Sequence, residues 1–154
     1  MATITIVTHG EMDDSLNPGH LTRGMRQVEA LKQFLPEKPA EVHFGNSRRY
    51  IEMVRLLSLS LEELDKLPEN FYSCEAVGSP TSFKDERIWK FILELPDNSL
   101  ILAGSPLMKT LLKLAKSHEV QDLPDARSAS VYKVAIDDGE IVDVKHLFSA
   151  EDIT

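Results

Sequence analysis

The sequence has almost no cysteine, no long apolar run and a shortage of positive charge. Cys74 is the only cysteine in 154 residues, so no internal disulfide can form and a reducing compartment is expected. No stretch approaches the roughly 20 apolar residues that a membrane-spanning helix needs. Apolar residues near the N-terminus alternate with threonine and follow no basic segment, as in a strand rather than a signal peptide. These features predict a cytoplasmic protein without a membrane span.

The shortage of positive charge limits the expected partners. Asp and Glu number 25 and Lys and Arg 17, which gives a net charge of -8. This balance repels a phosphate backbone, so nucleic acid is not expected as a partner, and a small anion would need a local positive cluster. No His, Cys, Asp or Glu spacing resembles a metal site, and no glycine pattern resembles a nucleotide-binding loop. We therefore expect neither a metal nor a cofactor.

What the chain does have is a regular alternation of strand and helix patterns. With 42% hydrophobic residues, residues 1–154 fit one domain with one core. Strands are predicted near 4–8, 41–44, 71–74 and 99–103, and each is followed by a helical pattern, with Thr22, Ser47 and Ser105 as helix caps. Asp138-Gly139, between two alternating segments, predicts a hairpin. This order predicts an α/β fold: a three-layer, doubly wound domain with a mostly parallel central sheet, helices on both faces and a C-terminal β-hairpin.

Reactive side chains follow the predicted strands. His9 comes after the first, Arg49 opens the helix after the second, Glu75 follows the third, and Gly104-Ser105 open the helix after the fourth. Because parallel strands end at one edge of a sheet, we expect these residues to meet there. An arginine in the first helical turn is unfavourable unless an anion is nearby. A histidine nucleophile, an arginine, a proton donor and a helix start together suit a phosphate group.

Four segments resemble one protein family. His9-Gly10-Glu11 after an apolar strand resembles the Arg-His-Gly-Glu signature of the histidine phosphatase superfamily, also called phosphoglycerate-mutase-like. Residues 21–31 resemble its Leu-Thr-x-x-Gly-x-x-Gln helix, and 42–54 resemble the segment that carries its second phosphate-binding arginine, which falls on Arg49. Ser128-Ala129-Ser130-Val131 resembles the final hairpin of the small phosphohistidine-phosphatase-like branch. The resemblance covers nearly the whole chain.

The resemblance implies a reaction and a set of roles. His9 would take the phosphoryl group, Arg49 would hold its oxygens, and Glu75 would protonate the leaving group. The implied substrate is a small phosphomonoester or a phosphohistidine protein, and no cofactor is implied. The resemblance does not indicate an oligomeric state.

Two positions depart from the family. Thr8 stands where the family has an arginine, and Gly104 stands where it has a second histidine. Thr8 and Ser105 can each donate one neutral hydrogen bond to phosphate, and Gly104 can offer its backbone N–H. Each lost oxyanion donor lowers the rate by roughly 10²–10³. Two hypotheses stay open: a phosphate-binding protein with weakened or lost catalysis, or an active phosphatase that works through phospho-His9.

Other residues could replace the missing groups. Arg48, Lys109 and Arg127 are the nearest cations by sequence order, although solvated surface charge is the favoured expectation for each. His20 could close over the pocket, but a histidine in a flexible loop is the favoured expectation. Tyr50 falls on the buried stripe of the helix predicted near 48–57, so it is expected in the core.

Overall fold

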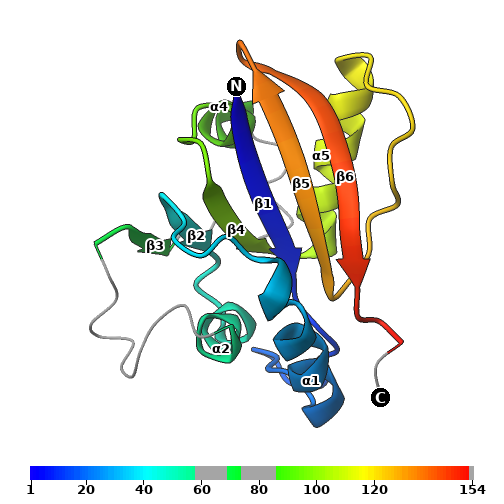
Figure 1. Ribbon diagram of the computed structural model, residues 1–154. Helices are drawn as coiled ribbons and strands as arrows, with labels where there is room; N and C mark the ends of the chain where they lie inside the picture. The colour runs from blue at the N-terminus through cyan, green and yellow to red at the C-terminus, as the bar shows by residue number, and fades with distance from the viewer. Residues whose placement is uncertain (58–68, 74–85, 153–154) are drawn as a thin grey trace.

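Strands and helices alternate along the chain as the sequence predicts (Figure 1). The computed structural model describes residues 1–57, 69–73 and 86–152, and for 86–89 it describes the backbone only. Predictions that fall on Cys74, Glu75 and the helix start at 82–85 lie outside these ranges. The elements are β1 (Ala2–Thr8), α1 (Thr22–Ala30), the 3-10 turn η1 (Lys32–Phe34), β2 (Val42–Phe44), α2 (Arg48–Leu56), β3 (Phe71–Ser73), α4 (Glu86–Leu93), β4 (Ser99–Ala103), α5 (Ser105–Ser117), β5 (Ser130–Asp137) and β6 (Glu140–Ser149).

The six described strands form one sheet in the order β3-β2-β4-β1-β5-β6. β1, β2, β3 and β4 run parallel, and β5 pairs antiparallel with both β1 and β6. In the β1–β4 ladder, Thr8 lies opposite Ala103, the last residue of β4. β1 and β4 therefore end side by side, and the residues that follow them emerge at the same edge.

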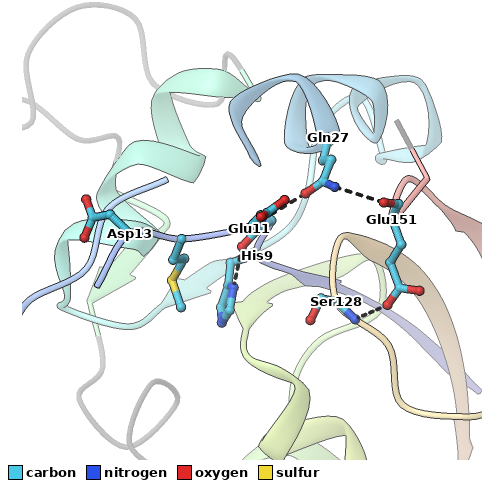
Figure 2. A pocket seen from close by; sticks show the side chains of 8 residues that line it. His9, Glu11, Asp13, Gln27, Ser128 and Glu151 are labelled. Carbon is cyan, nitrogen blue, oxygen red and sulfur yellow. Dashed lines mark hydrogen bonds between the residues drawn. The ribbon is translucent and has the colours of Figure 1, made fainter. Parts of the chain in front are cut away.

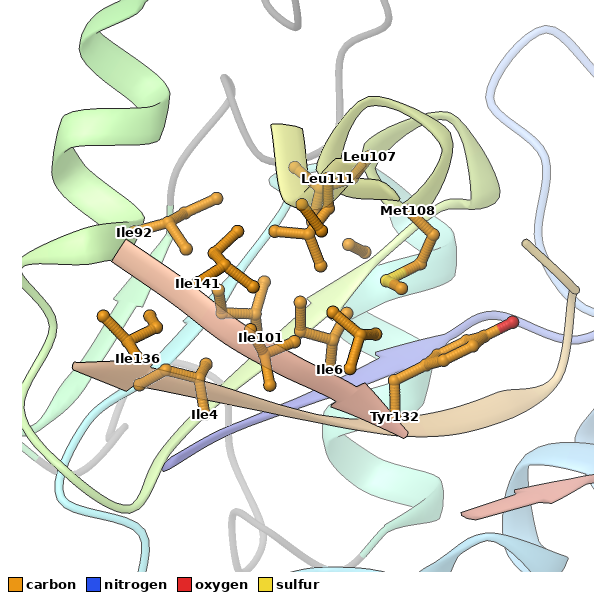
Figure 3. Close-up of a cluster of buried hydrophobic side chains, with 14 of the residues drawn as sticks. Ile4, Ile6, Ile92, Ile101, Leu107, Met108, Leu111, Tyr132, Ile136 and Ile141 are labelled. Atoms are coloured by element: carbon orange, nitrogen blue, oxygen red, sulfur yellow. The ribbon is translucent and has the colours of Figure 1, made fainter. Parts of the chain in front are cut away.

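Each face of the sheet is covered by its own apolar cluster. Ile4 and Ile6 of β1 pack with α4 and α5, represented by Ile92 and Leu107 (Figure 3). Val7, on the opposite face of the same strand, packs with residues of α1 and α2. A strand buried on both faces is typical of the centre of a parallel sheet. The predicted three-layer α/β architecture is confirmed.

Helix ends differ from the predictions at two caps. Thr22 is the first residue of α1, with Leu21 in the cap position, and α1 ends at Ala30 before η1. Ser105 was predicted as the cap of α5, but it is the first helical residue, and Gly104 is the cap. The reason is that Gly104 continues the extended backbone of β4, with φ -99 and ψ 168. Helix α5 therefore begins at Ser105, one residue earlier than predicted.

The C-terminal hairpin is confirmed. Asp138 and Gly139 both have positive φ, 52 and 74, as the tight primed turn between two strands requires. The hairpin also closes back on β1, because the N–H of Ala129 donates to the carbonyl of His9 at 2.8 Å. This contact brings the segment before β5 to the edge where β1 ends. None of the helices within the described ranges is long and apolar enough to cross a membrane.

Candidate functional site

The structure brings together His9, Arg49 and Gly104, three of the residues that the sequence places at strand ends. A Cβ atom built on Gly104 would lie 3.5 Å from His9 Nε2. Burial lowers the pKa of His9, and the positive charge of Arg49, in the first turn of α2, acts in the same direction. β1, β4 and the loop after β2 therefore converge at the carboxyl edge of the sheet, where ligands bind in open α/β folds.

A backbone hydrogen bond fixes the orientation and the tautomer of the His9 imidazole. Its Nδ1 lies 3.0 Å from the carbonyl oxygen of Gly10. A carbonyl only accepts hydrogen bonds, so Nδ1 carries the proton and Nε2 keeps a free lone pair in the neutral ring. Burial lowers the pKa of His9 to about 4, helped by the charges of Arg49 and His20 and opposed by the Gly10 bond. At neutral pH, His9 is therefore uncharged, with Nε2 directed toward Gly104.

The backbone after His9 is fixed by a close approach of α1. A Cβ on Gly24 would overlap the backbone of Glu11, and a Cβ on Gly10 would lie 2.5 Å from the carbonyl oxygen of Gly24. Both positions therefore need glycine, since any side chain would push the helix away from the loop. Gln27 accepts a hydrogen bond from the N–H of Glu11 at 2.9 Å and donates to the carbonyl of Glu151 at 3.1 Å (Figure 2). These contacts explain the Gly and Gln spacing in the first helix.

His20 is hydrogen-bonded to the same loop and is buried. The prediction of a histidine in a flexible loop is therefore wrong. The residue is only 4% exposed. Its Nε2 accepts the N–H of Gly10 at 3.0 Å, and its Nδ1 lies 3.1 Å from a carboxylate oxygen of Glu52. Burial lowers the pKa of His20, although Glu52 acts in the opposite direction. Glu52 thus orients His20, which in turn holds the backbone N–H of Gly10, the residue whose carbonyl fixes His9.

The Thr8 hydroxyl is used inside the fold. Thr8 is fully buried, its O–H donates to the carbonyl of Arg127 at 2.7 Å, and its oxygen accepts the N–H of Ser130 at 3.0 Å. A hydroxyl has one proton to give. Phosphate contact by Thr8 would therefore require it to leave the Arg127 carbonyl. Ser105, the other predicted neutral donor, is half-buried in the first turn of α5, which carries no acidic residue.

Replacing Thr8 by Val is expected to lower the free energy of unfolding by about 1–3 kcal/mol. Valine keeps the volume but leaves the Arg127 carbonyl and the Ser130 N–H without the hydroxyl between them. Urea unfolding followed by circular dichroism measures the effect. Thr8→Ser retains the hydroxyl and is the matched control, expected to lose less. A Thr8→Val protein as stable as the wild type would show that the hydroxyl bridge contributes nothing.

A cavity of about 410 Å³ opens beside His9 (Figure 2). Its lining contains three carboxylates, those of Glu11, Asp13 and Glu151, besides Gly10, Met12, Gln27 and Ser128. Each carboxylate lies near an arginine outside the lining: Arg23 at 3.4 Å from Glu11, Arg48 at 3.9 Å from Asp13, and Arg127 at 4.0 Å from Glu151. The three carboxylates give this cavity an acidic lining, and Arg49 is not among the residues that line it.

Neither a scan of protein-family models nor a search of curated proteins finds a match to this chain. Solved structures do match. YhfR from Bacillus stearothermophilus superposes with a TM-score of 0.71 at 16% identity, over 99% of this chain and 100% of that chain. The protein histidine phosphatase SixA, complexed with tungstate, has a TM-score of 0.68 at 13% identity, covering 96% and 97%. The chain has the histidine phosphatase fold.

A third match with this fold is phosphoserine phosphatase from Entamoeba histolytica, solved with phosphoserine. Its TM-score is 0.64 at 10% identity, over 92% of this chain and 94% of that chain. Superpositions at such low identity establish the fold only. The chemistry has to be inferred from the residues of this chain. Of the residues expected at the site, Glu75 lies outside the described ranges, so its position in this histidine phosphatase fold stays a prediction.

Arg48, Lys109 and Arg127, the cations nearest by sequence order, lie at the surface, as expected. Arg48 and Arg127 are 53% and 48% exposed at their side chains, and both are near the carboxylates of the cavity. Arg48 also lies 3.8 Å from Glu52. Lys109 is exposed on α5. Within the described ranges, no three His, Cys, Asp or Glu side chains are placed to hold a metal ion.

Proposed function

We propose that this chain belongs to the histidine phosphatase superfamily and binds phosphate or a phosphorylated ligand at His9, with catalysis weakened or lost. One observation carries the proposal: His9 Nε2 keeps a free lone pair and faces Gly104 at the start of α5. A helix start offers unsatisfied N–H groups and a partial positive charge to an anion. The Arg49 side chain adds a full positive charge close enough to shift the pKa of His9.

Two positions account for the weakened catalysis. Gly104 supplies no side chain, and the only hydroxyl proton of Thr8 is given to the Arg127 carbonyl. If each missing oxyanion donor lowers the rate by roughly 10²–10³, the two together lower it by about 10⁴–10⁶. Donors in one site are rarely additive, so the actual loss is smaller where a neighbour substitutes. Binding survives such losses better than turnover does, because turnover requires the extra contacts made in the transition state.

The second candidate function is that of an active phosphatase, and the neutral imidazole of His9 favours it. In that reaction, the Nε2 lone pair attacks phosphorus while the bond from phosphorus to the leaving oxygen or nitrogen breaks. Glu75 would give its proton to the leaving atom, and water would then displace Nε2 from the phosphoryl group while the Glu75 carboxylate takes up the proton that the water loses. The substrate class is a small phosphomonoester or a phosphohistidine protein. A ring that is already neutral at pH 7 needs no base to begin this sequence.

Hydrolysis of an aryl phosphate by the wild type and by His9→Ala tests the proposal. We expect phosphate to bind measurably in calorimetry, and hydrolysis to be slow or undetectable. Any hydrolysis should fall to the buffer rate in His9→Ala, with phospho-His9 detectable by mass spectrometry of the wild type. His118→Ala is the control, because His118 follows the opposite end of α5 from Gly104.

The outcomes separate the two candidates. Fast turnover through phospho-His9 would favour the active phosphatase over the weakened one. Absence of phosphate binding together with hydrolysis that is unchanged in His9→Ala would contradict both, because His9 would then have no part in the site.

A further inference from the structure

Tyr50 is the third residue of α2, directly after Arg49, and it lies in the interior at 1% exposure. The sequence explains it as one member of an apolar helix face, and its ring does pack in the core with residues of α1 and β4. Its ring also meets the ring of His9 edge-on, with centroids 6.1 Å apart and planes inclined by 65°. The tyrosine therefore reaches from the core to the site.

The hydroxyl of Tyr50 faces the same point as the nucleophile. A Cβ built on Gly104 would lie 3.2 Å from Tyr50 Oη and 3.5 Å from His9 Nε2. The same Cβ would lie 3.3 Å from Pro106 Cδ, so the hydroxyl, the imidazole and the proline ring surround one point beside Gly104, where this chain has no side chain of its own. A core tyrosine without a ligand role has no need to direct its oxygen there, since phenylalanine would fill the same apolar volume.

The hydrogen-bonding state of Tyr50 leaves its proton available. Its side chain is hydrogen-bonded to Arg49. A guanidinium has donors only, so the phenol oxygen accepts this bond and its own O–H is left to donate elsewhere. Burial raises the pKa of Tyr50, against the smaller effect of Arg49, so the phenol stays protonated at neutral pH. A neutral buried donor beside a helix start and an arginine suits a phosphoryl oxygen.

We propose that Tyr50 contacts the bound phosphoryl group, donating its O–H to an oxygen held between His9 Nε2 and the start of α5. It thereby supplies from α2 the side-chain donor that Gly104 lacks. This inference rests on the proposed function and adds a residue to its site. Tyr50 and Gly104 then serve the same phosphoryl oxygen, because a larger residue at 104 would crowd the hydroxyl.

Calorimetric titration with phosphate and with tungstate tests the role of Tyr50. Tyr50→Phe keeps the ring and removes only the oxygen, and a hydrogen bond to a charged group corresponds to about 10-fold in affinity or more. We expect that loss for both anions, with a thermal unfolding curve close to that of the wild type. Tyr72→Phe, on exposed β3, removes the same atom far from α5 and should bind like the wild type. Equal affinities of Tyr50→Phe and wild type would overturn the inference.

A second variant tests whether positions 50 and 104 serve one oxygen. Adding Gly104→His to Tyr50→Phe places an imidazole donor where the phenol oxygen has been removed, so part of the lost affinity should return. In the Tyr50 background the same histidine has its Cβ 3.2 Å from Tyr50 Oη, and no gain is expected. A double variant that binds no better than Tyr50→Phe would overturn the shared role.

A failure of the proposed function and a failure of the Tyr50 inference give different binding results. If the wild type binds neither phosphate nor tungstate, the anion site itself is wrong. If the wild type binds and Arg49→Ala does not, while Tyr50→Phe binds normally, the site stands and the inference about Tyr50 alone is overturned.

Discussion

Acidification from pH 7 to pH 4 is expected to lower the free energy of unfolding by about 3 kcal/mol through His9 alone. Burial lowers the pKa of this histidine to about 4 from its ordinary 6.5, because the charged ring is poorly solvated between β1, α2 and α5. Between these two values the unfolded chain binds a proton that the folded protein does not. The contribution of His9 to the free energy of unfolding is therefore fully present above pH 6.5 and is lost as the pH drops toward 4.

Urea unfolding at a series of pH values measures this loss. His9→Gln removes the titrating group, so its free energy of unfolding should depend much less on pH over the same range. Some dependence should remain, because burial also lowers the pKa of His20. A His9→Gln protein with the full wild-type slope would contradict the assignment of His9 as a buried neutral histidine.

Arg49→Ala is expected to weaken phosphate and tungstate binding by about 10- to 100-fold, the usual size of a hydrogen-bonded charge contact. Arg49 is the arginine whose charge acts on His9, His20 and Tyr50 together. Its loss removes both a positive charge and a fork of donors from the anion site.

The preceding residue supplies the matched control. Arg48 lies in the same helical turn but extends toward Asp13 and Glu52, and its side chain is 53% exposed. Arg48→Ala should change anion affinity by no more than about 2-fold, since an exposed ion pair contributes little. Calorimetry on both variants at fixed ionic strength gives the comparison. Equal losses in the two variants would mean that general positive charge near α2, rather than Arg49, attracts the anion.

Much of the fold could be predicted from the sequence, because local patterns and tertiary packing agree. β4 occupies 99–103 as expected, since a continuous apolar run bounded by turn residues suits a parallel strand that is buried on both faces. Asp138-Gly139 specifies its turn through backbone angles that few other residues adopt. The meeting of His9, Arg49 and Gly104 follows from the order of parallel strands, and the structure brings all three together.

What the sequence could not indicate depends on contacts between distant positions. His20 is buried because Glu52, 32 residues further along, accepts its N–H and its ring proton, and no local pattern encodes that pairing. Helical spacing correctly predicted that Tyr50 is buried, but the period of a helix says nothing about where a phenol oxygen points. The Thr8 hydroxyl likewise finds its partners at 127 and 130, on the neighbouring strand β5 and just before it.

We expect an anion to bind at His9 on the Arg49 side. A crystal structure of the wild type grown with tungstate tests it most directly. We predict one tungstate within hydrogen-bond or coordination distance of His9 Nε2, with its oxygens contacted by the Arg49 guanidinium and the N–H groups at the start of α5. A well-ordered site without tungstate at saturating concentration, or tungstate bound only at other places, would contradict the claim.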